Sequence, residues 1–413
     1  MLKRWNLSFV RSASYLLVLV MALALGEGLT LADGKPIRIG IPTALQVQVG
    51  RDTIDAAQLA VDEINAAGGV LGRKLEFVAA DETETPEAGI NAIKKLTNSD
   101  KVDVLIGGYT SGVTLAQLPH ISAAKTLYLG VGAASPAITA KVKQDYDNYK
   151  YIFRVNPLNT KWLATFLVDY LVNFIAKEQG FKKIAIVGES AKWVQDLVPV
   201  LKSGARDGGS DVSLTELFDV NTSDFSPLFS KVRASGAQYL VVALSHASSD
   251  VFVKQWSDAQ VPLPIGGIDV KSQDGDFFTR VGGKSLSETT QIGFMRVPLS
   301  PVTVPFWDAF VKRFGRKPVY TAGGAYDAIR AYAEAVTRAK TTQTDAVIKE
   351  LEKTNMPSTS GRIVFDENHD VKYGSGFVTP MMVQWQQDGE RVVVWPKDKV
   401  NGKFILPPWV KKQ

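Results

Sequence analysis

The chain has 413 residues, of which 45% are hydrophobic and 22% are charged, and its formal net charge is +5. This balance is that of an ordinary globular protein, and the length predicts two domains or one very large one. So small a charge, without any run of Lys or Arg, does not indicate nucleic-acid binding. The chain has no cysteine, which excludes disulfides, thiolate catalysis, cysteine metal sites and lipidation of an N-terminal cysteine.

Residues 1–32 have the pattern of a secretory signal peptide. Three basic residues precede an apolar stretch at residues 15–25, and small residues lead up to Ala32. This order is typical of a cleaved signal. An uncleaved anchor is the alternative, but the apolar run is shorter than the ~20 residues that a spanning helix needs. We therefore expect an exported protein that is cleaved near Ala32.

Short apolar strands alternate with helices between residues 37 and 136, and each strand runs into a loop of small and polar residues. This alternation predicts a parallel sheet with helices on both faces. In such sheets ligands bind at the carboxyl ends of the strands, where these loops lie. The predicted strands are residues 37–41, 75–78, 104–107 and 127–129, and the helices are residues 52–67, residues 86–97 and one that begins at Gly112.

A second series of the same kind follows residue 156, with strands predicted at 184–188, 212–218 and 239–244. The C-terminal third has too little sheet to stand alone. It holds strands at 291–297 and 381–385, helices at 304–314, 322–340 and 345–354, and a tail without a predicted element. We therefore predict two similar α/β lobes between which the chain crosses three times. Residues 33–155 and 295–375 form the first lobe, and residues 156–294 and 376–413 form the second.

Several motifs, in this order along the chain, resemble the periplasmic solute-binding proteins of the leucine/isoleucine/valine-binding type, which serve ABC importers. The resemblance implies a type I periplasmic-binding fold, in which two Rossmann-like lobes are joined by three hinge crossovers and trap a ligand between them. It does not imply which ligand. The matching segments are residues 60–75, 106–107 with 110–113, 132–136, 151–154, 222–225 and 325–328.

Residues 110–112 follow a predicted strand and open a predicted helix. Backbone N–H groups at a helix start lack partners, and the helix dipole favours an anion there. Ser111 adds a hydroxyl donor, so a carboxylate can be held here without Arg. The alternative is that Ser111 only caps its helix, but the carboxylate-binding Ser of the family aligns with Ser111. Thr110, Gly112 and the preceding Tyr109 complete this part of the predicted site.

The resemblance extends the predicted site to both lobes. It implies that Gly132 and Ala134 lie on the loop whose backbone groups hold the ligand's ammonium and carboxylate, a plain turn being the alternative. In the second lobe, Trp193 matches an aromatic lid position, although a core or surface Trp is the alternative. Asp269 lies near the family's acidic partner for a ligand ammonium.

Two departures from the family pattern weaken the prediction of an α-amino acid. Amino-acid binders of this family often have Tyr where this chain has Val49, and Thr where it has Ala134. Ala134 keeps the backbone N–H and loses the hydroxyl. A lost hydrogen bond to a charged group costs roughly 1.5–3 kcal/mol, which leaves room for amides or other small carboxylates.

Motifs of enzymes are missing from the sequence. The three histidines, His120, His246 and His369, are far apart and do not have metal-ligand spacing. No nucleophile elbow and no phosphate-binding loop occurs, and Ser245 beside His246 is not a triad. The sequence predicts no catalytic site, no metal site and no cofactor.

We therefore predict a periplasmic, monomeric solute-binding component of an ABC importer. It captures a small amino acid between its lobes and delivers it to a permease in the inner membrane. The alternatives are a binding protein for amides, urea-like compounds or aromatic and aliphatic carboxylates, a ligand sensor of the same fold, and a secreted enzyme.

Overall fold

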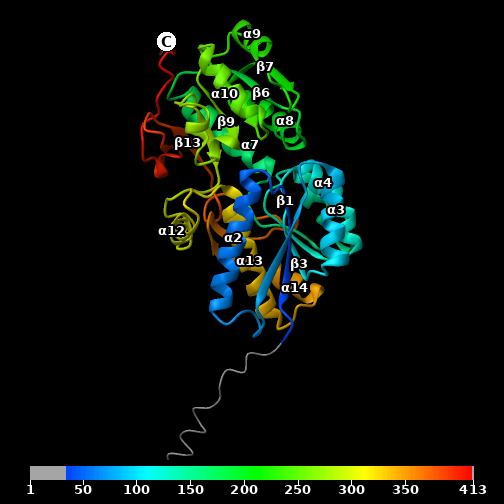
Figure 1. Cartoon of the computed structure of the whole chain (residues 1–413). Coiled ribbons are helices and arrows are strands. Elements are labelled where there is room, and N and C mark those ends of the chain that lie inside the picture. Colours follow the sequence, from blue (N-terminus) through cyan, green and yellow to red (C-terminus); the bar gives the residue numbers. More distant parts are fainter. Residues whose placement is uncertain (1–33, 412–413) are drawn as a thin grey trace, which may run out of the picture.

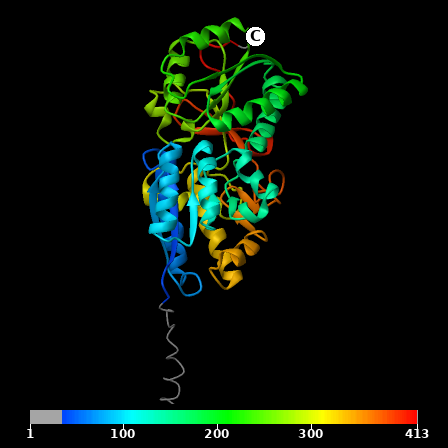
Figure 2. The ribbon, with the colours of Figure 1, turned by 90° about the vertical axis from the view of Figure 1, so that its right-hand side faces the viewer.

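The computed structural model describes residues 34–411, so the predicted signal peptide at residues 1–32 lies outside the described residues. Two α/β lobes are stacked along the long axis of the molecule (Figures 1 and 2). We call the lobe that contains the first strands the N-lobe and the other the C-lobe. Within residues 34–411, no helix has the length and apolar character needed to cross a membrane.

The N-lobe is built on a parallel sheet with the strand order β2-β1-β3-β4-β5. Its strands are β1 (Ile37–Thr43), β2 (Leu75–Asp81), β3 (Val104–Gly107), β4 (Leu127–Gly130) and β5 (Ile152–Arg154).

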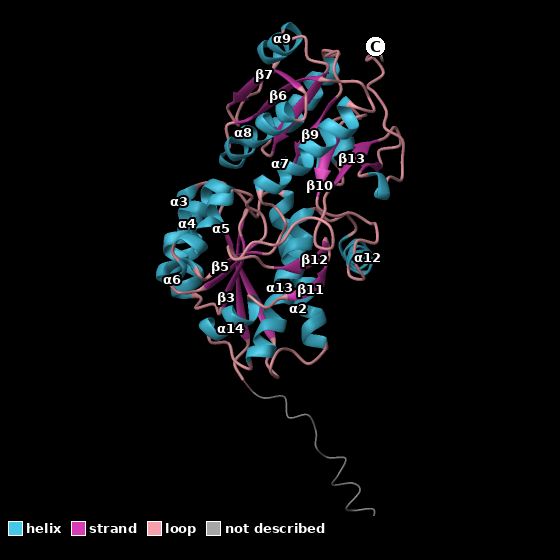
Figure 3. Ribbon diagram, turned by 180° about the vertical axis from the view of Figure 1, so that it is seen from behind, coloured by secondary structure: helices cyan, strands magenta, loops and turns pink. Residues whose placement is uncertain are grey.

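Helices cover both faces of this sheet, as Figure 3 shows. One face packs against α2 (Gln48–Ala66), α12 (Thr303–Phe314), α13 (Tyr320–Ala339) and α14 (Thr344–Leu351). The opposite face packs against α3 (Pro86–Lys94), its π-helical extension η1 (Lys95–Ser99), α4 (Ser111–Ala123) and α5 (Pro136–Gln144), and the short α6 (Tyr146–Tyr149) follows α5.

The C-lobe has a mixed sheet with the order β14-β13-β10-β9-β8-β6-β7. The first five of its strands along the chain are parallel, whereas β13 and β14 are antiparallel to their neighbours. The strands are β6 (Lys183–Glu189), β7 (Asp211–Phe218), β8 (Tyr239–Leu244), β9 (Ile265–Asp269), β10 (Thr289–Ile292), β13 (Met381–Trp385) and β14 (Arg391–Trp395).

Helices on the two faces of the C-lobe sheet enclose two apolar clusters. One face carries α7 (Thr160–Asp169), η2 (Tyr170–Ala176) and α8 (Lys192–Asp207), and the other carries α9 (Ser226–Ala234), α10 (Ser248–Asp258) and α11 (Phe277–Arg280). Two 3-10 turns, η3 (Lys271–Gln273) and η4 (Lys397–Lys399), follow β9 and β14.

The chain crosses between the lobes after β5, after β10 and before β13, as predicted. Because β10 runs toward the N-lobe and β13 returns from it, the two strands pair antiparallel, with Ile292 opposite Met381. Helices α12–α14 belong to the N-lobe core, with α12 packed on α2, although they follow the second crossover. The residues at which we divide the lobes stay a prediction.

The structure corrects three predicted elements. The strand predicted at 291–297 is β10, which begins at Thr289 and ends at Ile292, and the residues after it form the second crossover. A hairpin of β11 (Asn355–Ser358) and β12 (Gly361–Val364) was not predicted, because Pro357 argues against a strand. The predicted irregular tail contains β14, which pairs with β13. Its Val-rich sequence at residues 392–394 carried the signal for a strand.

Candidate functional site

A cavity of about 260 Å3 lies between the two lobes. The loops after β2, β3 and β4 form its N-lobe wall, and the loops after β6, β8 and β9 form its C-lobe wall. These are carboxyl ends of parallel strands, where ligands bind in α/β sheets. Seven of the eight predicted site residues line the cavity, and their part in binding stays a prediction. They are Tyr109, Thr110, Ser111, Gly112, Gly132, Ala134 and Trp193.

The N-terminus of α4 opens onto this cavity. Thr110 is the N-cap residue, and no side chain caps the helix within the described chain. The helix ladder starts with the N–H of Thr114, which donates to the carbonyl of Thr110. The N–H groups before it have no partner inside the helix, so this end offers several donors and a positive dipole to an anion.

Ser111 does not cap its helix, and its side chain points to the neighbouring loop instead. Its Oγ accepts hydrogen bonds from the backbone N–H groups of Ala134 at 3.1 Å and Ser135 at 3.0 Å. An oxygen that accepts two hydrogen bonds still has its own proton to donate. Ser111, which is 3% exposed, thus offers one O–H to the cavity beside the open helix end.

The loop after β4 packs closely against the loop after β3, and Gly132, which has no side chain, allows this close approach. A Cβ at Gly132 would lie 2.2 Å from the carbonyl oxygen of Gly108. The Gly132 carbonyl accepts a hydrogen bond from Tyr320 Oη at 3.3 Å. The N–H of Ala134, which we expected to face a ligand, donates to Ser111. The loop therefore fixes the position of the Ser111 hydroxyl.

The C-lobe wall is organised around a buried carboxylate, Glu189 at the end of β6. It accepts hydrogen bonds from the N–H groups of Ser245 and His246, from the hydroxyls of Ser245 and Ser248, and from His246 Nδ1 at 2.8 Å. Trp193 Nε1 donates to Ser245 Oγ at 3.0 Å. The indole ring is thereby held in one orientation against the cavity.

Glu189 and His246 form an ion pair. Burial raises the pKa of the Glu189 carboxyl, but the hydrogen bonds and the charge of His246 outweigh it, so the pKa is lowered. Burial lowers the pKa of His246. The hydrogen bond with Glu189 and the negative charge of Glu189 outweigh that effect, so the pKa of His246 is raised. On its other side, His246 Nε2 lies 3.9 Å from Glu84 Oε1, which belongs to the N-lobe.

The grouping of Ser245, His246 and Glu189 is not a catalytic relay. In such a relay, one ring nitrogen of the histidine faces the hydroxyl and the other faces the carboxylate. Here Nδ1 of His246 faces both Ser245 and Glu189, and Ser245 Oγ donates directly to Glu189. The serine hydroxyl is held by the carboxylate and is not activated for attack.

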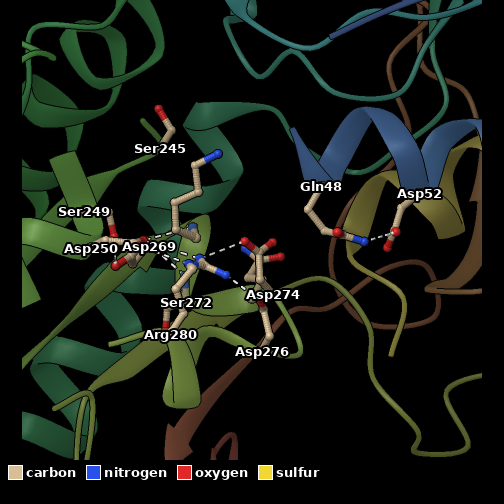
Figure 4. A network of polar contacts seen from close by, with 12 residues as sticks. Gln48, Asp52, Ser245, Ser249, Asp250, Asp269, Ser272, Asp274, Asp276 and Arg280 are labelled. Atoms are coloured by element: carbon tan, nitrogen blue, oxygen red, sulfur yellow. Dashed lines mark hydrogen bonds and ion pairs between the residues drawn. The ribbon is translucent and has the colours of Figure 1, made fainter. Parts of the chain in front are cut away.

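Asp269 is the predicted site residue that the structure does not bring to the cavity. Its side chain is fully buried and accepts hydrogen bonds from Ser249 Oγ at 2.6 Å and from the N–H groups of Lys271 and Ser272. Figure 4 shows this carboxylate beside Ser249 and Ser272. It is absent from the cavity lining, because it closes the turn that follows β9. The expected acidic partner for an ammonium group is therefore not Asp269.

Sequence reasoning missed several residues that line the cavity. These are Glu84, Lys192, His246, Gln273, Gln291, Tyr320 and Tyr373. Glu84 follows the predicted strand at 75–78, so the rule that ligands bind at strand ends was the signal that could have found it. Gln273 and Tyr373 follow no predicted strand and belong to no motif. Among the described residues, no group of three or more His, Cys, Asp and Glu side chains is arranged to hold a metal ion.

Two lobes joined by three crossovers over a cavity define a binding-protein fold, and comparison with known proteins agrees. Residues 36–390 match the periplasmic binding protein family, and the chain belongs to that family. It is similar to the Leu/Ile/Val-binding protein homolog 8 of Brucella melitensis, with 25% identity over 373 residues that cover 86% of this chain and 89% of that protein.

Two solved structures have the same fold, which confirms the predicted fold class. One is the branched-chain amino acid transporter substrate-binding protein of Streptococcus pneumoniae in complex with isoleucine. It has a TM-score of 0.75 and 22% identity, over 87% of this chain and 100% of that one. The other is an ABC transporter solute-binding protein of Rhodopseudomonas palustris in complex with 3,4-dihydroxybenzoic acid. It has a TM-score of 0.76 and 21% identity, over 89% of this chain and 98% of that one.

Proposed function

We propose that this chain is the periplasmic solute-binding component of an ABC importer. It captures a small amino acid or a closely related small carboxylate between its lobes and delivers it to a permease in the inner membrane. The family and the named relatives support the transport role. A cavity of about 260 Å3 is smaller than the ~300 Å3 at which pockets for drug-sized ligands begin, which suits a small solute.

The open N-terminus of α4 beside Ser111 is the observation that carries this proposal. The helix end and one hydroxyl offer donors to an anion, and the walls around them are largely apolar, with Leu158, Ile268 and Val270 among the lining residues. A solute with a carboxylate and an apolar body complements this arrangement. The carboxylate is bound without Arg, by Ser111 and backbone N–H groups.

Contacts across the cavity support a closing motion of the two lobes. Tyr109 Oη of the N-lobe donates to the carbonyl of Ser245 at 3.0 Å, and Ser135 Oγ donates to Asp196 Oδ2 at 2.5 Å. Both bonds break if the lobes separate about the crossovers. A ligand that touches both walls binds the closed form more tightly than the open form. This difference in affinity shifts the equilibrium toward the closed form. The permease then recognises the closed monomer.

An aromatic or aliphatic carboxylate without an ammonium group is the second candidate. Ala134 provides no hydroxyl, and Asp269 is tied to its own turn. The neighbour from Rhodopseudomonas palustris is described in complex with an aromatic acid. These observations favour ligands that need no acidic partner.

A thermal-shift screen of the mature chain tests the proposal. Amino acids, amides, and aromatic and aliphatic acids are compared at equal concentration, and the best compounds are measured by calorimetry. A ligand at a hundredfold excess over its Kd stabilises the folded form by about 2.7 kcal/mol. We expect at least one carboxylate to raise the melting temperature. If none does, or if the chain turns over a compound unaided, the proposal is wrong.

A further inference from the structure

Three polar side chains that line the cavity have buried atoms without a hydrogen-bond partner within residues 34–411. The atoms are Oε1 of Gln273, both Nε2 and Oε1 of Gln291, and Oη of Tyr373. Gln273 is 5% exposed and Gln291 is 3% exposed. An unsatisfied buried polar atom costs about 1–3 kcal/mol, and such atoms are rare in native proteins. Their occurrence together in one cavity points to a polar group that enters it.

Gln273 and Tyr373 are held in place by contacts of their side chains, and Gln291 by the pairing of its backbone in β10. Gln273 Nε2 donates to the carbonyl of Gln291 at 3.3 Å, which leaves its Oε1 free. The ring of Tyr373 stacks on Trp162 with 5.7 Å between the ring centroids. Gln291 is fixed by its place in β10, which has neighbours on both sides. The group is thus positioned in advance, and its two glutamines belong to the C-lobe, opposite Ser111 of the N-lobe.

Several carboxylates near these side chains have partners of their own, although Asp274 Oδ1 has none within residues 34–411. Asp274 pairs with Arg280 at 3.0 Å, and Figure 4 shows Arg280 among Asp250, Asp274 and Asp276. Asp269 binds its own turn, and Glu189 binds His246.

Two cations near the group are committed, whereas Lys271 makes no ion pair with any of the described residues. Arg391 donates to the carbonyls of Ser272 and Gln273 at 3.0 and 2.9 Å, and Lys192 pairs with Asp196. The glutamine side chains themselves carry no charge, so they suit a neutral hydrogen-bonding group, whereas burying an ion is costly.

We propose that Gln273, Gln291 and Tyr373 form a second polar subsite that takes an uncharged hydroxyl or carboxamide group of the solute. A carboxamide of the solute presents a donor and an acceptor. The free oxygens of Gln273 and Gln291 can accept from its N–H group, and the free Nε2 of Gln291 can donate to its oxygen. The inference rests on the proposed function, because the carboxylate at Ser111 fixes the other end of the ligand. The solute is then a small carboxylic acid with an apolar middle and a neutral hydrogen-bonding group at its far end.

Matched pairs of ligands test this subsite by calorimetry on the mature chain. Phenylalanine and tyrosine, benzoate and 4-hydroxybenzoate, and norvaline and glutamine each share a carboxylate and differ in the far polar group. We expect the polar member of at least one pair to bind about tenfold or more tighter, because a site built to hydrogen-bond a group rejects the analogue that lacks it.

Gln291→Met is the variant that separates the subsite from the rest of the cavity, since it keeps the length of the side chain and removes both polar atoms. We expect the discrimination to disappear, while the plain member of the pair binds as it does to the wild type. Gln273→Met is the second variant, in case the first does not fold, and melting curves without ligand check both.

The outcomes distinguish this inference from the proposed function. If carboxylates bind but no pair is discriminated, the subsite is wrong and the proposed function stands. If Gln291→Met weakens both members of a pair equally, the glutamine is a general structural element and the subsite is again wrong. If no carboxylate binds to the wild type, the proposed function fails and the subsite falls with it.

Discussion

The two walls of the cavity are built by different means. On the N-lobe side, the donors are backbone N–H groups, one hydroxyl and a glycine loop. On the C-lobe side, the wall is made of side chains that hold one another in place, with Trp193, His246 and the two glutamines as its main members. We therefore propose that the N-lobe wall binds a feature common to many solutes, whereas the C-lobe wall decides which solute fits.

Gly132→Ala is expected to have the largest effect, because it forces the N-lobe wall apart. The added Cβ would lie 2.2 Å from a backbone carbonyl, so the loop must move. Overpacking of this kind costs roughly 1–3 kcal/mol, and we expect ligand binding to be lost with it. Denaturant unfolding and calorimetry measure the two effects.

Gly112→Ala is the matched control, since a Cβ at Gly112 meets nothing within 4 Å. We expect its free energy of unfolding to match that of the wild type; because Gly112 lines the cavity, this variant is a control for stability and not for ligand binding. Equal losses in the two variants would contradict the role that we give to the close approach at Gly132.

Ser111→Ala removes the only side-chain donor that we assign to the carboxylate end. We expect the affinity for a carboxylate ligand to fall by about 1.5–3 kcal/mol. Stability should fall as well, because the N–H groups of Ala134 and Ser135 lose their acceptor. Calorimetry on Ser190→Ala, which changes a serine of the C-lobe wall, should give nearly the wild-type affinity. An unchanged affinity in Ser111→Ala would remove Ser111 from the site.

Trp193→Phe probes the C-lobe wall more gently, since it keeps an aromatic ring and removes the hydrogen bond to Ser245. We expect a loss of about 0.5–1.5 kcal/mol in ligand affinity. Trp409→Phe removes a similar bond, to the carbonyl of Val261, outside the cavity lining, and serves as the control. If both variants bind alike, Trp193 does not orient the ligand.

His246→Gln is expected to have the smallest effect and to depend on pH. The raised pKa of His246 stabilises the fold fully below its ordinary value of 6.5, and this contribution is lost as the pH rises through the folded value. The lowered pKa of Glu189 contributes above its ordinary value of 4.5 and is lost as the pH falls through the folded value. The difference in melting temperature between the wild type and the variant should therefore be largest between pH 4.5 and pH 6.5. A difference that does not change with pH would contradict the ion pair.

The same contrast explains how far the sequence carried the predictions. Residues 110–112 were predicted from a local signal, a helix that starts directly after a strand, whereas the family resemblance placed Gly132 in the predicted site. The C-lobe wall depends on which side chains tertiary packing turns toward the cavity. Asp269 is the last residue of β9, a strand that was not predicted, and its carboxylate turns to the N–H groups two and three residues ahead. Gln291 lies inside a strand. The alternation of side chains along a strand does not by itself tell which face of the sheet lines a cavity.

The position of β13 and β14 has a consequence for how this protein is made. They form one edge of the C-lobe sheet but are the last strands of the chain, and helices α12–α14 of the N-lobe also come late. Neither lobe is complete until nearly all of the polypeptide is available. Pairings between distant segments form slowly, so a nascent chain stays unfinished for most of its synthesis.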